Sequence, residues 1–359
     1  MGCIVSSHRV DTAPMSIQKT WQKELGQETV LAALTRLDQD ILNSEKLYPA
    51  QRLIVVSAEL ESIQQEIKEF EETTPSLANM SGSYPKTMHQ IFVSLDLYRR
   101  PMLATENEDF VANVNRKEMR KIELLWLRTR EKQLQRERRM LHARLLRIRS
   151  LYTKLQQLLD SIWKNDPRQG KQLEEALSRA RALRDALATV SSRLRAAADY
   201  AHTALKLLDD ALPTWKLASI GKSGWERTSA CVDACVLLIN ARCAERGARR
   251  VLAASAAPRA ARALRLALDY AFTDTMHDYK CQRATETFLL FKEALIQLVQ
   301  SIHQVLLNNA ENLTVAEKDL LERQRQLRAA RVNDIEKRGL ADLKYESASL
   351  DNLKNKGNL

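Results

Sequence analysis

The sequence predicts an all-α fold, an elongated bundle of long antiparallel helices that includes a coiled-coil hairpin. Glycine and proline number only 9 and 8 in 359 residues, too few for the many turns of a β-rich protein. Good helix formers dominate, and aromatic residues make up 5% of the chain. Apolar residues recur every three or four positions over most of the length. We therefore expect aliphatic rows, more than an aromatic core, to hold the bundle together.

The first part of the chain predicts a helical hairpin over residues 16–72, after a flexible start at residues 1–15. Apolar residues at helical spacing indicate one helix over 16–48. Pro49 suits the first position of a second helix, which runs to Glu72. Residues 73–114 are expected to form a loop and a short helix, because their first half is rich in Pro, Gly, Ser and Thr.

A long helix is predicted from Asn115 to Lys164, a stretch without proline or glycine that would extend over roughly 75 Å. Apolar residues repeat every seven positions along it, as in a supercoil, at Leu127, Leu134, Leu141, Ile148, Leu155 and Ile162. The companion row is charged at Arg130, Glu137 and Arg144. The middle of this helix should therefore be less well covered than its ends.

The segment 165–170 has turn chemistry, and a returning helix should follow it and complete the hairpin. One apolar row of that helix consists of Leu173, Ala180, Leu187, Leu194, Ala201 and Leu208. The other consists of Ala176, Leu183, Val190, Ala197, Ala204 and Ala211. Alanine-rich rows let two helices approach closely, which predicts a tight antiparallel coiled coil that ends at Pro213.

Three more helices complete the long-helix bundle predicted over residues 115–338. The first covers about 228–256, and the second begins at Arg259 and continues past residue 305. Thr314 and Glu317 have the spacing of a capping box, which predicts the start of a final helix. Gly339 should end it, leaving a flexible polar tail at 339–359.

Several function classes are excluded at this level. The sequence contains no stretch of about 18 uncharged apolar residues, so we expect no transmembrane helix. The start also lacks a secretory signal, so we expect a cytosolic chain.

Cys231 and Cys235 lie one turn apart as a possible half of a metal site. No second pair of ligands accompanies them, so we interpret them as buried structural thiols and expect no metal or cofactor.

An enzyme is not expected either. The six histidines are dispersed, and none has a nucleophile and an orienting acid at a supporting spacing. The Gly-Lys-Ser sequence at 221–223 resembles a phosphate-binding loop only superficially, because Lys216 occupies the position of the first required glycine. We interpret it as a loop between helices.

The N-terminal heptapeptide carries the clearest functional signal. Gly2 would supply the amine for myristoylation once the initiator methionine is removed, with Ser6 as the small hydroxyl of the motif, and Cys3 offers a palmitoylation site. One acyl chain binds membranes marginally, whereas two anchor stably. The heptapeptide resembles the dual-acylation starts of Src-family kinases and of some G-protein α subunits, and the resemblance covers these residues alone. It implies a lipid-anchored protein on the cytosolic face of a membrane.

Positive charge is concentrated in the long helix. Residues 1–100 hold 10 Lys and Arg against 13 Asp and Glu, whereas residues 116–150 hold 13 against 4. A second basic run covers residues 242–265. The candidate contact residues for anionic lipid or a protein partner are Arg128, Arg130, Lys132, Arg136, Arg138, Arg139, Arg144, Arg147 and Arg149.

Three interpretations of these cations remain open. They contact anionic lipid, or they pair with acids of neighbouring helices such as Glu59, Glu61, Glu66 and Glu69, or they bind nucleic acid. Nucleic acid ranks last, because the helix lacks interleaved aromatic residues that stack on bases and an acylated start would hold the chain away from the nucleus.

Together these features predict a lipid-anchored peripheral membrane scaffold or adaptor. Long helices with a basic surface are similar in shape and charge to the BAR-type architecture, without a sequence motif behind the likeness. The alternative is a cytoplasmic coiled-coil subunit of a larger complex, whose basic helix binds an acidic protein. Other coiled-coil proteins or a second copy of the chain are further expected partners. The sequence does not identify the partner, the membrane, the pathway or the oligomeric state.

Overall fold

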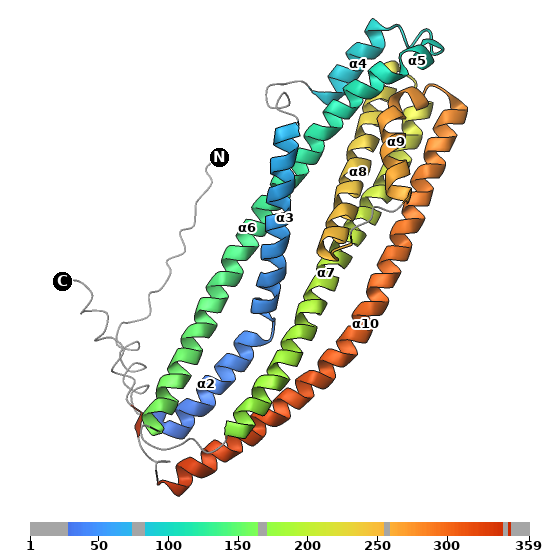
Figure 1. Ribbon diagram of the computed structural model, residues 1–359. Coiled ribbons are helices and arrows are strands. Elements are labelled where there is room, and N and C mark those ends of the chain that lie inside the picture. The colour runs from blue at the N-terminus through green and yellow to red at the C-terminus, as the bar shows by residue number, and fades with distance from the viewer. Residues whose placement is uncertain (1–27, 74–82, 164–170, 255–258, 340–343, 346–359) are drawn as a thin grey trace, which may run out of the picture. The chain divides into compact units, whose positions relative to one another are not determined.

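Long helices form nearly all of the described structure, which confirms the predicted all-α bundle (Figure 1). The computed structural model describes residues 28–73, 83–163, 171–254, 259–339 and 344–345. Gly2 and Cys3 lie outside these residues, as do the turn at 165–170 and most of the predicted polar tail. The elements are β1 (Glu28–Thr29), α2 (Val30–Glu45), α3 (Pro49–Thr73), α4 (Tyr84–Ser94), α5 (Leu103–Glu106), α6 (Glu108–Ile162), α7 (Lys171–Ile220), α8 (Gly224–Val251), α9 (Arg259–Asp274), α10 (Asp278–Lys337) and β2 (Lys344–Tyr345).

The chain divides into two compact units. The smaller one comprises residues 1–47, 146–180 and 319–359, and the larger one comprises 48–145 and 181–318. In the smaller unit, α2 packs its apolar face on the last turns of α6 and α10, where Leu34, Leu158 and Ile335 are almost fully buried. The Thr29 side chain caps α2 by accepting a hydrogen bond from the Ala32 N–H. The indole N–H of Trp163 donates to Asp334 at 2.7 Å.

The core of the larger unit contains more aromatic side chains than the composition suggested. The largest fully buried side chains there include Trp215, Phe92, Phe272, Phe288 and Phe291. The rings of Trp215 and Phe288 meet edge to face with centroids 5.1 Å apart, and those of Phe92 and Phe272 at 6.1 Å. The chain has few aromatic residues, but it gathers them between α4, α7, α8, α9 and α10. Aliphatic residues still make up most of this core, and the aromatic side chains are concentrated within it.

The heptad row of α6 is buried from Leu127 to Ile148, and the neighbour of its first part is α3. Leu127, Leu134 and Leu141 form one cluster with Val56, Leu60, Ile63 and Ile67 of α3. The alanines of α7 instead enter the core formed with α8 and α10. Close approach is needed there, because a Cβ on Gly247 of α8 would lie 2.7 Å from the ring of Tyr200.

The second apolar row of α7 is incomplete, contrary to expectation. Leu183 is 57% exposed and Val190 is 44% exposed, whereas Ala197, Ala204 and Ala211 are buried. The helix therefore contributes a two-row core surface only in its second half. Periodicity alone did not reveal this, because it counts apolar residues and does not record which helix covers them.

Several helix boundaries differ from the sequence prediction, and the helix predicted from Arg259 past residue 305 is divided into α9 and α10. Pro213 lies inside α7, which continues to Ile220 with Trp215 buried in the core, so packing of this segment outweighs the lost backbone hydrogen bond. α10 runs through residue 314 without a break, and the Thr314 hydroxyl donates to the Glu311 carbonyl inside it. The capping box belongs instead to α8, where Ser223 and Glu226 form both of its hydrogen bonds.

Candidate functional site

The candidate site is a segment of α6 with exposed basic side chains. In the larger unit these are Lys132, Arg136, Arg138, Arg139 and Arg144, which we call the α6 basic segment. None of the five forms an ion pair with another residue of the described chain. Arg147 and Arg149 are exposed in the smaller unit. Seven of the nine cations expected to contact a partner are therefore available to solvent.

The other two expected contact residues pair with α3. Arg128 contacts Glu71 at 2.7 Å, and both side chains are about half exposed. Arg130 contacts Glu59 at 3.1 Å, and the Glu59 side chain is only 1% exposed. For these two arginines the internal ion-pair interpretation is correct, and Arg130 is mostly buried by its pair whereas Arg128 remains half exposed.

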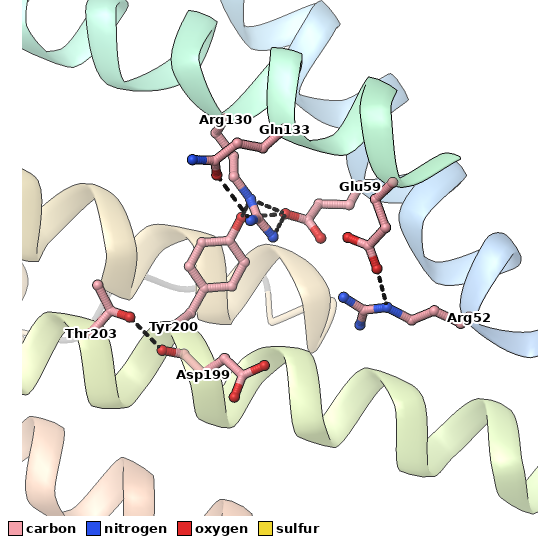
Figure 2. Close-up of polar contacts among 8 residues, drawn as sticks. Arg52, Glu59, Arg130, Gln133, Asp199, Tyr200 and Thr203 are labelled. Atoms are coloured by element: carbon pink, nitrogen blue, oxygen red, sulfur yellow. Dashed lines mark hydrogen bonds and ion pairs between the residues drawn. The ribbon is translucent and has the colours of Figure 1, made fainter. Parts of the chain in front are cut away.

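Arg130 lies in a buried polar cluster between α3, α6 and α7 (Figure 2). The Tyr200 hydroxyl donates to Glu59, and the Arg130 guanidinium reaches both residues and lies 4.7 Å from the centre of the Tyr200 ring. Burial raises the pKa of Tyr200, and the neighbouring Glu59 carboxylate raises it further. Burial lowers the pKa of Arg130, but Tyr200 and Glu59 outweigh burial and raise it overall. Both side chains keep their protons at neutral pH, so the cluster is structural.

The charged companion positions of α6 explain how α3 covers this helix. The guanidinium of Arg52 on α3 donates to Glu137 at 2.7 Å. The Glu59 carboxylate of the same helix accepts hydrogen bonds from Arg130 (Figure 2). Arg144, the third charged position, is exposed. At Arg130 and Glu137, α3 therefore covers α6 with side chains of opposite charge, and at Arg144 the helix remains exposed.

Exposed apolar side chains share the outer side of α6 with its cations. Leu125 is 66% exposed and Met140 is 61% exposed. Spacings of seven and four residues put Leu125, Lys132, Arg136 and Met140 on one side of the helix, opposite the buried row. This outer side therefore offers both positive charge and exposed apolar area to whatever contacts it.

The second basic run is used differently. Arg246 and Arg250 of α8 both contact Glu66 of α3, the first at 2.7 Å, and Arg249 contacts Glu245 at 2.6 Å. Arg242 pairs with Glu123 of α6. Arg242, Arg246 and Arg250 thus join α8 to α3 and α6, whereas the Arg249 pair lies within α8. None of these four arginines is free to form one exposed surface with the α6 basic segment. Arg259, Arg262 and Arg265 on α9 are exposed.

The other candidate chemistry gives no site. Cys231 and Cys235 are buried free thiols, and burial raises the pKa of Cys231. The Nε2 atoms of His202 and His303 lie 3.1 Å apart on the surface. The described residues contain no group of three or more side chains arranged to hold a metal ion. None of the described helices is long and apolar enough to cross a bilayer.

Comparisons with known proteins add no identification, since the chain matches no protein family model, no curated protein and no solved structure. Sequence reasoning missed the exposed apolar side chains of Met140 and Leu125, although their spacing relative to Lys132 and Arg136 was a usable signal. It also missed Tyr200, and no spacing could have paired that residue with Glu59.

Proposed function

We propose that the protein is a peripheral membrane scaffold, anchored by acyl chains at Gly2 and Cys3, whose α6 basic segment binds anionic lipid. One observation carries the proposal: the five cations of this segment are exposed and unpaired within the described chain, whereas Arg128 and Arg130 on the same helix are paired with α3. Cations that lie next to acids of a neighbouring helix form ion pairs with them. The cations of the α6 basic segment have no such acid within the described chain and are free to bind an external anion.

The magnitudes favour a combination of two weak attachments. Each Lys or Arg near an anionic surface contributes about 1 kcal/mol, and the effect decays within a Debye length of about 8 Å at physiological salt. A single myristoyl chain alone binds marginally, at about 0.8 kcal/mol per buried CH₂. Basic residues and exposed Met140 and Leu125 would add both electrostatic and apolar attraction to the anchor. A helical bundle held in this way would serve as a scaffold on the membrane.

Vesicle binding by protein that lacks acyl chains tests the lipid contact. Recombinant unacylated protein should cosediment with phosphatidylserine vesicles and not with phosphatidylcholine vesicles, and the bound fraction should fall steeply as salt rises. Equal binding to both vesicle types, or no binding to either, would contradict the proposal. The second outcome would favour the acidic protein partner.

Fractionation of cells tests the anchor separately. Gly2→Ala removes the myristoyl amine and should move the protein from the membrane fraction to the soluble fraction, while Cys3→Ser should leave a weak, reversible membrane pool. A Gly2→Ala protein that distributes like the wild type would show that acylation plays no part.

A further inference from the structure

A charged cavity lies in the larger unit where α3, α6, α8 and α9 meet. Its volume is about 360 Å³, and charged side chains make up most of its wall. Volumes of this size are within the range of small-molecule sites. Its arginines come from α6, α8 and α9, so three helices direct positive charge to one place.

Ion pairs neutralise only part of this wall. Arg116 contacts Asp269 at 3.2 Å, and Arg246 contacts Glu66 at 2.7 Å. Arg242 pairs with Glu123. Each of these pairs joins two different helices, which explains why the charges are retained in the interior: they fix the packing of the four helices around the cavity.

Two arginines of the wall remain without an acid. Arg120 on α6 is half-buried and Arg265 on α9 is exposed, and neither forms an ion pair within the described chain. The one acid left over, Glu69, is exposed and accepts a hydrogen bond from Gln65 at 2.9 Å. The cavity wall therefore has an excess of positive charge.

Arg242 adds a third unused donor. The residue is 9% exposed, and its Nε–H is buried without a hydrogen-bond partner although the far end of the guanidinium meets Glu123. A buried donor without an acceptor is unfavourable. Burial lowers the pKa of Arg242 to about 10, and the nearby cations Arg246 and Arg265 add to this effect. An anion in the cavity would relieve both the missing acceptor and the repulsion.

We propose that this cavity binds a phosphate group, with Arg120, Arg265 and the Nε–H of Arg242 as its donors. The planar guanidinium fork matches the oxygens of phosphate, and such charge-assisted hydrogen bonds are among the stronger ones in proteins. The cavity has room for a pyrophosphate or a phosphorylated ring. None of its residues belongs to the α6 basic segment, so the proposal goes beyond the membrane function and does not depend on it.

Calorimetric titration with sodium pyrophosphate at constant ionic strength tests the site. The wild type should bind, and an Arg120→Gln/Arg265→Gln variant should bind at least about tenfold more weakly. Neither residue is fully buried, and removing Arg265 reduces repulsion on Arg242, so the variant should unfold at a temperature no lower than the wild type. The matched control is Arg259→Gln/Arg262→Gln, which removes the same charge from α9 outside the cavity and should bind like the wild type.

A second arm distinguishes a soluble phosphate from a lipid headgroup. Vesicles with phosphatidylinositol bisphosphate are compared with phosphatidylserine vesicles of equal surface charge. The site would be assigned to a lipid headgroup if the wild type and the Arg259→Gln/Arg262→Gln control both prefer the phosphorylated lipid and the Arg120→Gln/Arg265→Gln variant does not. Pyrophosphate binding without such a preference would assign it to a soluble ligand. If the variant matches the wild type in both arms, or the wild type responds in neither, the cavity is not a phosphate site, whatever the result with phosphatidylserine alone.

Discussion

The arginines of α6 and α8 look alike in sequence and serve opposite purposes in the structure. On α8, Arg242, Arg246 and Arg250 are at least two-thirds buried at the side chain, and each is paired with a carboxylate of α3 or α6. In the α6 basic segment the cations are exposed and have no acid within the described chain. The first group stabilises the bundle, and the second is available to something outside it.

A high density of positive charge therefore does not by itself mark a binding surface. The acids Glu66 on α3 and Glu123 on α6 face α8 and are matched to it. The cations of the α6 basic segment form no ion pair with an acid of the described chain. The position of the neighbouring acids therefore decides whether a basic helix is a structural element or a contact surface.

The largest effect should follow from breaking a buried pair on α8. Arg242→Ala leaves Glu123, whose side chain is 5% exposed, without its partner, and should cost about 3–5 kcal/mol of unfolding free energy. Arg136→Ala, its exposed counterpart on α6, should change stability by less than about 0.5 kcal/mol. Urea unfolding monitored by circular dichroism measures both. Similar losses for the two variants would remove the distinction between the two groups of arginines.

A comparison of two leucines tests which side of each helix is covered. Leu134 on α6 is fully buried against α3, and Leu134→Ala should cost about 2–5 kcal/mol. Leu183→Ala on α7 should be nearly neutral, because that side chain is 57% exposed. Chemical unfolding of the two proteins checks this. A large loss of unfolding free energy in Leu183→Ala would show that this side chain is buried, as the heptad pattern of α7 predicted.

Asp274 is a partly buried carboxylate for which burial outweighs the attraction of the nearby cations Lys280 and Arg283. Burial raises its pKa to about 7 from an ordinary value near 4. The folded state therefore holds this proton while the unfolded chain releases it, so stability falls as pH rises from about 4 to 7 and is level above that.

Asp274→Asn removes this pH dependence. The free energy of unfolding of the variant should equal that of the wild type near pH 4 and exceed it by about 1 kcal/mol at pH 8. The expected difference is modest because the Asp274 side chain is partly exposed and screened by solvent. Thermal unfolding across this range measures the difference. A gain that is constant with pH would mean that the carboxyl is not protonated in the folded protein.

Helix content and the buried α6 row were predictable, because they depend on local propensity and on the seven-residue spacing of Leu127, Leu134 and Leu141. The identity of the partner helix was not, since α3 and α7 both offer apolar rows and only the whole fold chooses between them. The predictions that a helix ends at Pro213 and that another begins at Thr314 were wrong for the same reason. Packing around Trp215 outweighs the local signal at Pro213, and α10 continues through the local signal at Thr314.

The candidate site was predictable in part. Composition located the basic segment, but separating Arg130, which is paired with Glu59, from Arg136, which is exposed, required the positions of acids far away in sequence. The cavity beside Arg242 had no sequence signal at all, because its wall is assembled from four helices.

The most direct test of the membrane account compares two variants that lose equal charge. One replaces the α6 basic segment with glutamine. The control replaces five exposed cations elsewhere in the larger unit that are unpaired within the described chain, namely Arg193, Arg195, Lys216, Lys222 and Arg259. In cosedimentation of unacylated protein with phosphatidylserine vesicles, the α6 variant should bind at least about tenfold more weakly than the wild type and respond less to salt, while the control stays within about twofold. Equal weakening of both variants would show that net charge alone drives binding and would contradict the assignment to α6.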